Sequence, residues 1–206
     1  MDGVDVVMEV VPQPRIFEWN IFHHHLMSRS LLDIDGVLCH DPSTDQNDDG
    51  VNYRRFLLDA KLRVRPSFEI MGLVTSRLEK YRAETTRWME ANGIQFKELH
   101  MLDLPSAEER RRLSAHGSFK GEVYKRSSAE LFIESESLQA RVIASISGKP
   151  VLSLEDMEVY TPGLVSLRGA VERTKRSKGL KKFARSLLGK PLRGFKLNRA
   201  ETERLP

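Results

Sequence analysis

Short apolar runs alternate along the central part of the chain with longer segments that mix apolar and charged residues. Five runs have the length and apolar content of buried strands, and they cover residues 30–37, 68–77, 96–104, 129–135 and 149–154. The intervening segments have helical character and cover residues 56–64, 78–93, 106–117, 120–128 and 138–148. Strands that alternate with helices predict an α/β fold, a three-layer Rossmann-like parallel sheet with helices on both faces.

Local signals support two of the helix boundaries. Gly93 closes the segment 78–93 and lies just past the end of its predicted helix, as expected for a residue that ends a helix in the left-handed conformation. Ser106 precedes the next helix and Glu109 lies three residues further on, a pattern typical of a capping box.

Composition places the chain among ordinary globular proteins. Hydrophobic residues make up 40% and charged residues 30% of its 206 residues. No apolar run approaches the roughly 20 residues that a membrane-spanning helix needs. The opening residues lack the basic start and apolar stretch of a secretory signal, and Cys39 is the single cysteine. We therefore expect a cytoplasmic location.

Charged residues are distributed unevenly along the chain. Residues 168–206 contain 13 Lys/Arg against 3 acids, whereas the remainder contains 20 Lys/Arg and 26 acids. We expect an N-terminal arm over residues 1–29, a catalytic domain over 30–167 and a basic tail over 168–206. The tail includes a basic amphipathic segment that suits an anionic membrane surface, nucleic acid or an acidic partner. A solvated tail, or one that packs on the acidic body, is the simpler interpretation.

Ligands of open parallel sheets bind beyond the carboxyl ends of the strands, so the polar residues there are the first candidates for a site. Asp33 and Asp35 end the first predicted strand and are followed by Gly36, which allows a sharp turn. In extended backbone, side chains two residues apart point the same way, so both carboxylates are expected to face one site. Two close carboxylates with phosphate oxygens form a setting that Mg²⁺ prefers.

Further candidates follow other predicted strands. Thr75, Ser76 and Arg77 end the second strand, and Glu134 and Glu136 end the fourth. Three consecutive histidines, His23 to His25, cannot share one face of a regular element, so we interpret them as a polar stretch rather than metal ligands.

Four short motifs around these residues, in this order, resemble those of the haloacid dehalogenase (HAD) superfamily of phosphohydrolases. LLDIDGV is similar to its first motif, an apolar strand followed by DxDG, and LVTSR to its second. A lysine before the fourth strand and acids that close this strand, in FIESES, are similar to the third and fourth motifs. The resemblance spans about residues 30–153, and four motifs in order are far more specific than a lone DxDG.

The resemblance implies a role for each matching residue. Asp33 would be the nucleophile that forms an aspartyl-phosphate, and Asp35 the general acid and base. Thr75 and Lys120 would stabilise the transferring phosphoryl group, and Mg²⁺ would be held by Asp33, by Asp35 and by an acid of the fourth motif. Contacts to the substrate are expected from Gly36, Ser76 and Arg77.

Three points of this assignment stay open. Lys120 and Lys125 both precede the fourth strand, and we favour Lys120 because it opens the predicted helix. Either Glu134 or Glu136 would bind the metal, since residues that flank Ser135 alternate in direction. The family usually has aspartates at these positions, so glutamates would shift the metal or weaken the activity.

The space for a cap domain is small. Between Gly36 and Phe68 there is room for a loop and a helix, and the loop around 47–50 lies where a small flap would act. We expect a capless or minimally capped site that is open to a phosphorylated small molecule or glycan intermediate, or covered by a neighbouring subunit in an oligomer.

Short segments such as PRIFEWN and VTSRLEKYR show a narrower resemblance. They are similar to a group of dehalogenase-type proteins associated with phosphoribosyltransferase-like domains. The favoured function is a magnesium-dependent phosphatase. The alternatives are a catalytically weak binding or regulatory module on the same fold, and a phosphotransferase linked to phosphoribosyl metabolism.

Overall fold

The computed structural model describes residues 17–47, 49–113 and 115–162. The chain divides into two units, residues 1–167 and 168–206, and the whole of the basic tail lies outside the described residues. Within the described residues no helix is long and apolar enough to cross a membrane.

The described residues of the first unit form an α/β fold around one sheet. Its strands are β1 (Ser30–Leu32), β2 (Ile70–Leu78), β3 (Phe96–Leu102), β4 (Leu131–Glu134), β5 (Val151–Ser153) and β6 (Glu158–Tyr160). The order across the sheet is β3-β2-β1-β4-β5-β6, parallel except for the antiparallel pair of β5 and β6. β1 is therefore central, with β2 and β4 on its two sides.

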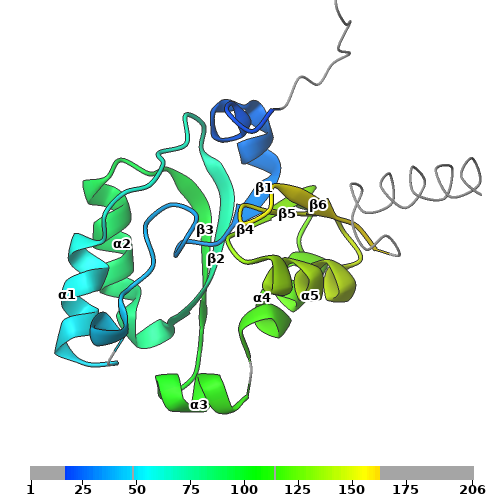
Figure 1. Ribbon diagram of the computed structural model, residues 1–206. Helices are drawn as coiled ribbons and strands as arrows, with labels where there is room; N and C mark the ends of the chain where they lie inside the picture. Colours follow the sequence, from blue (N-terminus) through cyan, green and yellow to red (C-terminus); the bar gives the residue numbers. More distant parts are fainter. Residues whose placement is uncertain (1–16, 48, 114, 163–206) are drawn as a thin grey trace, which may run out of the picture. The chain divides into compact units, whose positions relative to one another are not determined.

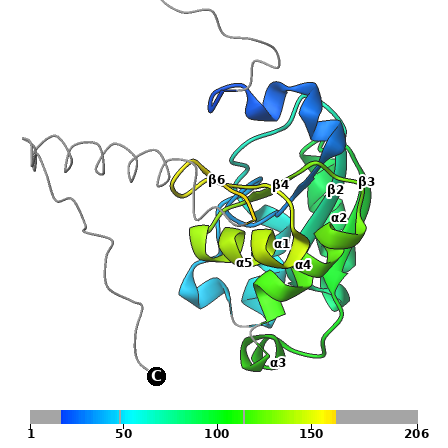
Figure 2. The same ribbon diagram turned by 90° about the vertical axis from the view of Figure 1, so that its right-hand side faces the viewer.

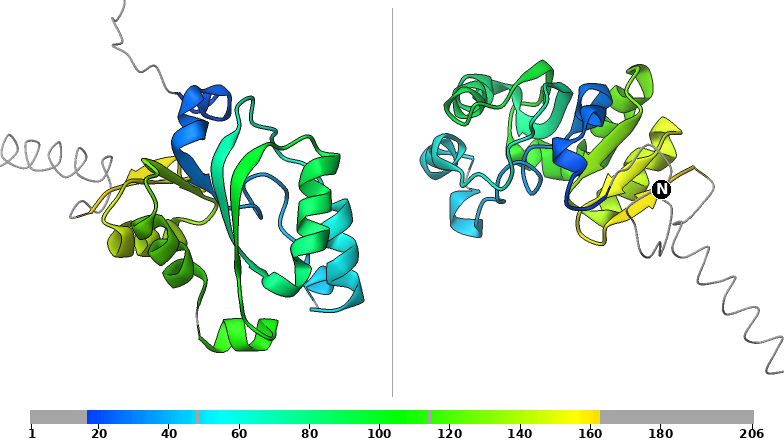
Figure 3. Two further views of the ribbon diagram at one scale, coloured as in Figure 1. Left: turned by 180° about the vertical axis from the view of Figure 1, so that it is seen from behind. Right: turned by 90° about the horizontal axis from the view of Figure 1, so that it is seen from above.

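Helices cover both faces of this sheet. The α-helices are α1 (Val51–Asp59), α2 (Arg82–Ala91), α3 (Ala107–Arg112), α4 (Ala115–Arg126) and α5 (Ser137–Ser147). Short 3-10 helices are η1 (Ile21–His23), η2 (His25–Arg29), η3 (Thr44–Gln46) and η4 (Glu79–Tyr81). α1 and α2 lie on one face and α4 and α5 on the other (Figures 1 and 3). The predicted three-layer α/β architecture is thus confirmed at the level of a Rossmann-like fold.

The alternation of strand side chains creates two cores. Leu31 and Phe132 belong to the cluster that includes Ile143 of α5, whereas their neighbours Leu32 and Ile133 belong to the cluster on the other face. Successive residues of a strand point to opposite faces, so a strand buried on both sides must be apolar throughout. This requirement explains the continuous apolar runs in the sequence.

The segment before β1 packs on the domain rather than standing apart from it. Ile21 and Met27 lie on η1 and η2 and are buried in the larger core cluster. The expected arm of residues 1–29 is therefore part of the domain where it is described, and residues 1–16 lie outside the described residues. These 3-10 helices lie at the end of the sheet opposite to α3 (Figure 2).

Several helix boundaries differ from the prediction. α2 begins at Arg82 instead of residue 78, and α3 ends at Arg112 instead of residue 117. The first helix spans Val51–Asp59 instead of residues 56–64, and α4 begins at Ala115 instead of residue 120. α4 contains Gly117 and Gly121, although glycine weakens an isolated helix. In the structure their missing side chains admit Val142 and Ile146 of α5, and a Cβ on Gly121 would lie 2.8 Å from the Cβ of Ile146. Close helix packing therefore outweighs the low helix propensity.

Two helix ends match the sequence signals. Gly93 follows α2 with a φ of 63°, and the Ser106 side chain accepts a hydrogen bond from the Glu109 amide. The Glu109 carboxylate pairs with Arg112. The N-cap prediction is confirmed, and the structure shows one of the two hydrogen bonds expected of a capping box.

Candidate active site

A pocket of about 270 Å³ lies beyond the carboxyl end of β1 and beside the C-terminal half of β2. Its wall includes Asp33 and Asp35 after β1, Thr75 and Ser76 on β2, and Lys120 on α4. These five residues come from distant parts of the sequence, and they meet because the strands are parallel and end on the same edge. Further residues complete the wall: Asp41, Pro42, Asn47, Tyr53, Arg110, His116, Ser135, Glu136 and Gln139.

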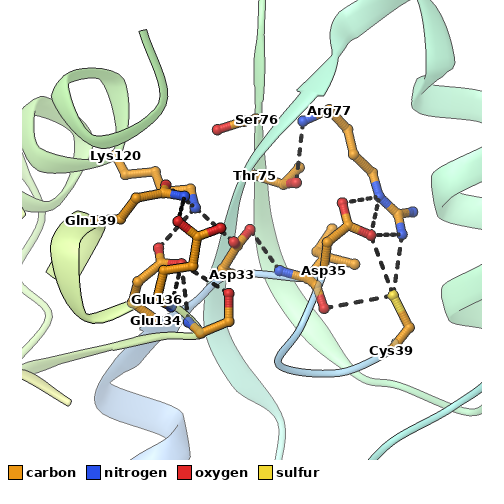
Figure 4. A network of polar contacts seen from close by, with 12 residues as sticks. Asp33, Asp35, Cys39, Thr75, Ser76, Arg77, Lys120, Glu134, Glu136 and Gln139 are labelled. Carbon is orange, nitrogen blue, oxygen red and sulfur yellow. Dashed lines mark hydrogen bonds and ion pairs between the residues drawn. The ribbon is translucent and has the colours of Figure 1, made fainter. Parts of the chain in front are cut away.

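Lys120 is the centre of the first network in the site (Figure 4). Its Nζ donates hydrogen bonds to Asp33 Oδ2 at 2.6 Å and to Glu134 Oε2 at 2.8 Å, and a third to Gln139 Oε1 at 3.1 Å. The side chains of Lys120, Asp33 and Glu134 are 2%, 7% and 0% exposed. Two buried carboxylates thus share one cation, which leaves one negative charge in excess.

The expected reason for choosing Lys120 over Lys125 was wrong. Lys120 lies in the middle of α4 and does not open it. It nevertheless reaches Asp33 and Glu134, whereas Lys125 lies in the last turn of the helix and is exposed. The direction of the side chain, and not its distance from the helix start, separates the two lysines.

Burial dominates the electrostatics of this network. It raises the pKa of Asp33 to about 7, with Lys120 opposing and Glu134 adding to the rise. Burial would lower the pKa of Lys120, but the two carboxylates outweigh it and hold that pKa above its ordinary value. The ammonium is therefore charged at neutral pH, and Asp33 is an acid whose ionised form is costly without a further cation.

Asp35 belongs to a second network on the other side of Asp33 (Figure 4). Its Oδ1 lies 2.6 Å from Arg77 Nη2, its Oδ2 lies 3.0 Å from Arg77 Nε, and Cys39 Sγ lies 3.3 Å from Oδ1. Asp33 and Asp35 line the same pocket but have different partners. Both residues therefore face one site, as expected. Because β1 ends at Leu32 and the chain then turns at Gly36, Asp35 is paired with Arg77 instead of Lys120.

Arg77 is fully buried behind Asp35 and is absent from the pocket wall among the described residues. Burial alone would raise the pKa of Asp35, but the charge and hydrogen bonds of Arg77 hold it below its ordinary value. Asp35 is therefore ionised at neutral pH. The guanidinium, which was expected to contact substrate, instead fixes the orientation of a carboxylate that lines the pocket.

The two glutamates of the fourth motif take different positions. Glu134 ends β4 and is fully buried; its Oε1 accepts hydrogen bonds from Ser135 N at 3.0 Å and Oγ at 3.2 Å, and its Oε2 accepts from Lys120. Glu136 lines the pocket and accepts a hydrogen bond from Gln139 Nε2 at 2.9 Å. Glu136 is thus the better placed of the two to bind a cation in the pocket.

Thr75 and Ser76 occupy the wall between the two networks (Figure 4). Thr75 is 1% exposed, and its Oγ1 accepts a hydrogen bond from the Arg77 amide at 3.2 Å. The Ser76 Oγ is buried and has no hydrogen-bond partner among the described residues. A hydroxyl left without a partner in a pocket wall is a group that a ligand or water completes.

Gly36 shapes the loop that carries Asp35 rather than lining the pocket. Its φ is 73°, and a Cβ at this position would lie 2.5 Å from Ser135 Cβ. A side chain here is therefore excluded both by backbone conformation and by the loop that follows β4. Gly36 allows the segments after β1 and β4 to come into contact at the pocket.

Gly36→Ala is expected to destabilise the protein by more than the roughly 1–2 kcal/mol that a left-handed alanine costs, because it also displaces Ser135. Gly148→Ala is the matched control, since Gly148 has the same φ of 73° and open space around its Cβ position. Urea unfolding of both variants measures the difference. Equal losses would show that the contact with Ser135 is unimportant.

Acids outnumber bases in the pocket wall. Asp41, which sequence reasoning missed, joins Asp33, Asp35 and Glu136 there, against Arg110 and Lys120. Burial raises the pKa of Asp41, and the charges of Asp35 and Glu136 raise it further. Its position in the polar loop after DxDG was the only sequence signal for it.

The donor chemistry of the wall fits Mg²⁺, which binds carboxylate oxygens, water and phosphate oxygens. Burial raises the pKa of Asp33 and of Asp41, and neighbouring carboxylates raise both further, so a divalent cation would stabilise their ionised forms. Among the described residues, however, no three His, Cys, Asp or Glu side chains are gathered as a ready metal site. Asp33 and Glu136 would hold the cation, with the remaining positions left to main-chain, water and substrate oxygens.

Comparison of the chain with protein-family models, with curated proteins and with solved structures gives no match.

Proposed function

We propose that the chain is a magnesium-dependent phosphatase of the haloacid dehalogenase type that acts through an aspartyl-phosphate at Asp33. The contact of Lys120 Nζ with both Asp33 and Glu134, at 2.6 and 2.8 Å, is the observation that carries this proposal. A lysine from α4 and an acid from β4 converge on the acid after β1, at the edge of the sheet where ligands bind.

The proposed reaction uses the residues of the pocket in two steps. An Asp33 carboxylate oxygen attacks phosphorus, and the bond between phosphorus and the ester oxygen breaks as the alcohol leaves with a proton. Water then attacks the aspartyl-phosphate, which releases inorganic phosphate and restores Asp33. Lys120 and the Thr75 hydroxyl offset the charge of the phosphoryl oxygens during both steps. When bound, Mg²⁺ supplies further neutralisation of that charge.

Asp35 is the proposed proton-transfer group. Its ionised state, maintained by Arg77, suits the second step, in which a base takes a proton from the attacking water. In the first step only the minor, protonated form of Asp35 would donate a proton to the leaving oxygen, and the ionised carboxylate would remain for the second step. Since Arg77 opposes protonation of Asp35, substrates with good leaving groups, such as aryl phosphates, are the most suitable for detecting activity.

The segment between Gly36 and β2 supports an open site. It contains η3 and α1, and the described part of it includes no further helix or strand. Substrate reaches the pocket without a large cap, and the pocket is smaller than the roughly 300–1,000 Å³ of drug-sized ligand sites. The substrate class that suits it is a small phosphomonoester.

The test is phosphate release from 4-nitrophenyl phosphate by the full chain. We expect release with Mg²⁺, its loss with EDTA, and its recovery when excess Mg²⁺ is added. Beryllium fluoride with Mg²⁺ should raise the melting temperature of the wild-type protein and leave that of Asp33→Asn unchanged, because it binds to the aspartate as a phosphoryl analogue. Absence of turnover with Mg²⁺, Mn²⁺, Co²⁺ and Zn²⁺, together with no response to beryllium fluoride, would contradict the proposal.

A phosphate-binding module without catalysis is the second candidate. It is favoured by the fact that the described residues have no ready cluster of metal-ligating side chains. Such a module would be stabilised by inorganic phosphate without any turnover, so the same experiments separate the two functions.

A further inference from the structure

Arg110 is a buried cation of the pocket wall that the proposed chemistry does not use. It lies on α3, is 8% exposed, and lines the pocket together with Asp33 and Ser76. Its Nη1 donates a hydrogen bond to the Ser76 carbonyl oxygen at 2.8 Å. Within the described part of the chain it forms no ion pair, and its Nε has no hydrogen-bond partner.

The hydrogen-bonding groups of Arg110 are only partly satisfied by the described residues. Arginine keeps its charge at all ordinary pH values, so a buried guanidinium without an acid cannot become neutral to reduce its cost. Arg110 also hydrogen-bonds the Tyr53 side chain, which lines the same pocket, so the Nε is the donor that stays without a partner. Arginine commonly binds carboxylate or phosphate through its Nε together with the adjacent Nη2. The buried Ser76 Oγ, on the residue that Arg110 contacts, also has no partner in the described residues. Two unsatisfied buried donors therefore belong to one stretch of the pocket wall.

Arg110 and Lys120 produce a positive potential that acts on His116. Burial lowers the pKa of His116, and the charges of Arg110 and Lys120 lower it further. His116 also lines the pocket. The pocket wall therefore has an acidic part, which suits a cation, and a basic part with Arg110 and Lys120, which suits an anion.

We infer that Arg110, with the Ser76 hydroxyl, binds a second anionic group of the phosphorylated substrate, a carboxylate or a second phosphate. The inference rests on the proposed phosphatase function and narrows its substrate class. A pocket of about 270 Å³ limits the distance between the two anionic groups, so the substrate is a small molecule with both on a short carbon skeleton.

The test compares three short phosphomonoesters: glycerol 3-phosphate, which has one anionic group, 3-phosphoglycerate, which adds a carboxylate, and propane-1,3-diol bisphosphate, which adds a phosphate. We expect kcat/KM of the wild type to favour one or both of the doubly anionic substrates by about tenfold or more. The better of the two identifies the second group. A wild type that turns over all three equally well would overturn the inference while the phosphatase proposal stands.

Arg110→Gln should remove most of this preference, and Arg111→Gln is the matched control. Arg111 is exposed on the same helix and should keep the preference. If Arg110→Gln slows all three substrates by the same factor, Arg110 contacts the transferring phosphoryl group instead and the inference is wrong. Circular dichroism and thermal unfolding establish that the variant folds.

Ser76→Ala gives a second test because it removes one hydroxyl and keeps the carbonyl oxygen that Arg110 contacts. It should lower the preference several-fold, and an unchanged preference in a folded Ser76→Ala protein would count against the inference. If the wild type turns over none of the three substrates, the phosphatase proposal is judged by 4-nitrophenyl phosphate and beryllium fluoride as described above, and the subsite is judged by calorimetric binding of 3-phosphoglycerate and the bisphosphate. Binding of either that is lost in Arg110→Gln and kept in Arg111→Gln supports the subsite, and no binding of either overturns it.

Discussion

Lys120→Met is expected to lower the free energy of unfolding by about 3–5 kcal/mol at neutral pH, because it leaves Asp33 and Glu134 buried without their shared cation. Methionine has a similar length, so the loss is electrostatic more than steric. Phosphatase activity should fall with it, since the ammonium faces the position of the transferring phosphoryl group. Urea unfolding and phosphate release measure the two effects.

Lys125→Met is the control for this change. Lys125 lies on the same helix, is exposed and has no buried carboxylate to neutralise, so its replacement should change stability by less than about 0.5 kcal/mol. Stability of the Lys120 variant should also rise as the pH falls. Without the cation the buried carboxylates bind protons more tightly in the folded than in the unfolded state, so acid favours the fold. A Lys120→Met protein as stable as wild type would contradict the role given to this network.

Asp33→Asn is expected to lower kcat for phosphate release by about 10⁴-fold or more, because the amide cannot attack phosphorus. The side chain keeps its size, and one of its atoms still accepts a hydrogen bond. The matched control is Asp103→Asn, since Asp103 directly follows β3 but is exposed and outside the pocket wall. Retention of activity in Asp33→Asn would refute the assignment of the nucleophile.

The same variant tests the electrostatics of the metal-free protein. Burial raises the pKa of Asp33 from an ordinary value of 3.8 to about 7, so the folded state binds the proton more tightly than the unfolded state. This acid therefore destabilises the fold as the pH rises from about 4 to about 7. The stability of Asp33→Asn relative to wild type should accordingly increase over that range. A constant difference would show that the pKa of Asp33 is close to its ordinary value.

The strand-end rule accounts for much of what the sequence predicts about this site. The apolar pattern alone predicts that Asp33, Thr75 and Glu134 each lie at or near the carboxyl end of a strand. Because neighbouring parallel strands end on one edge, the pattern brings these residues together without any knowledge of contacts. Lys120 lies on a helix, and its place in the site followed from the resemblance of the motifs.

The sequence pattern did not predict the direction of individual side chains or the burial of charged residues within helices. Arg110 lies in the run ERRR of α3, which is typical of a solvated helix, yet it is buried against β2. Arg77 follows the same strand-end pattern as Ser76, and only the turn after β1 directs Asp35 towards it. The antiparallel strand β6 is too short and too polar at one end to stand out from a loop.

The close contact of α4 with α5 has a consequence for the catalytic arrangement. Lys120 is next to Gly121, whose bare backbone lies against Ile146, and Gln139 on the opposing helix accepts a hydrogen bond from the same lysine. The two helices meet there without intervening atoms, so neither can slide or roll far without a steric clash. The packing of α4 on α5 thereby fixes the position of the Lys120 ammonium relative to Asp33. That packing depends on Gly121, which has only a hydrogen atom where other residues have a Cβ.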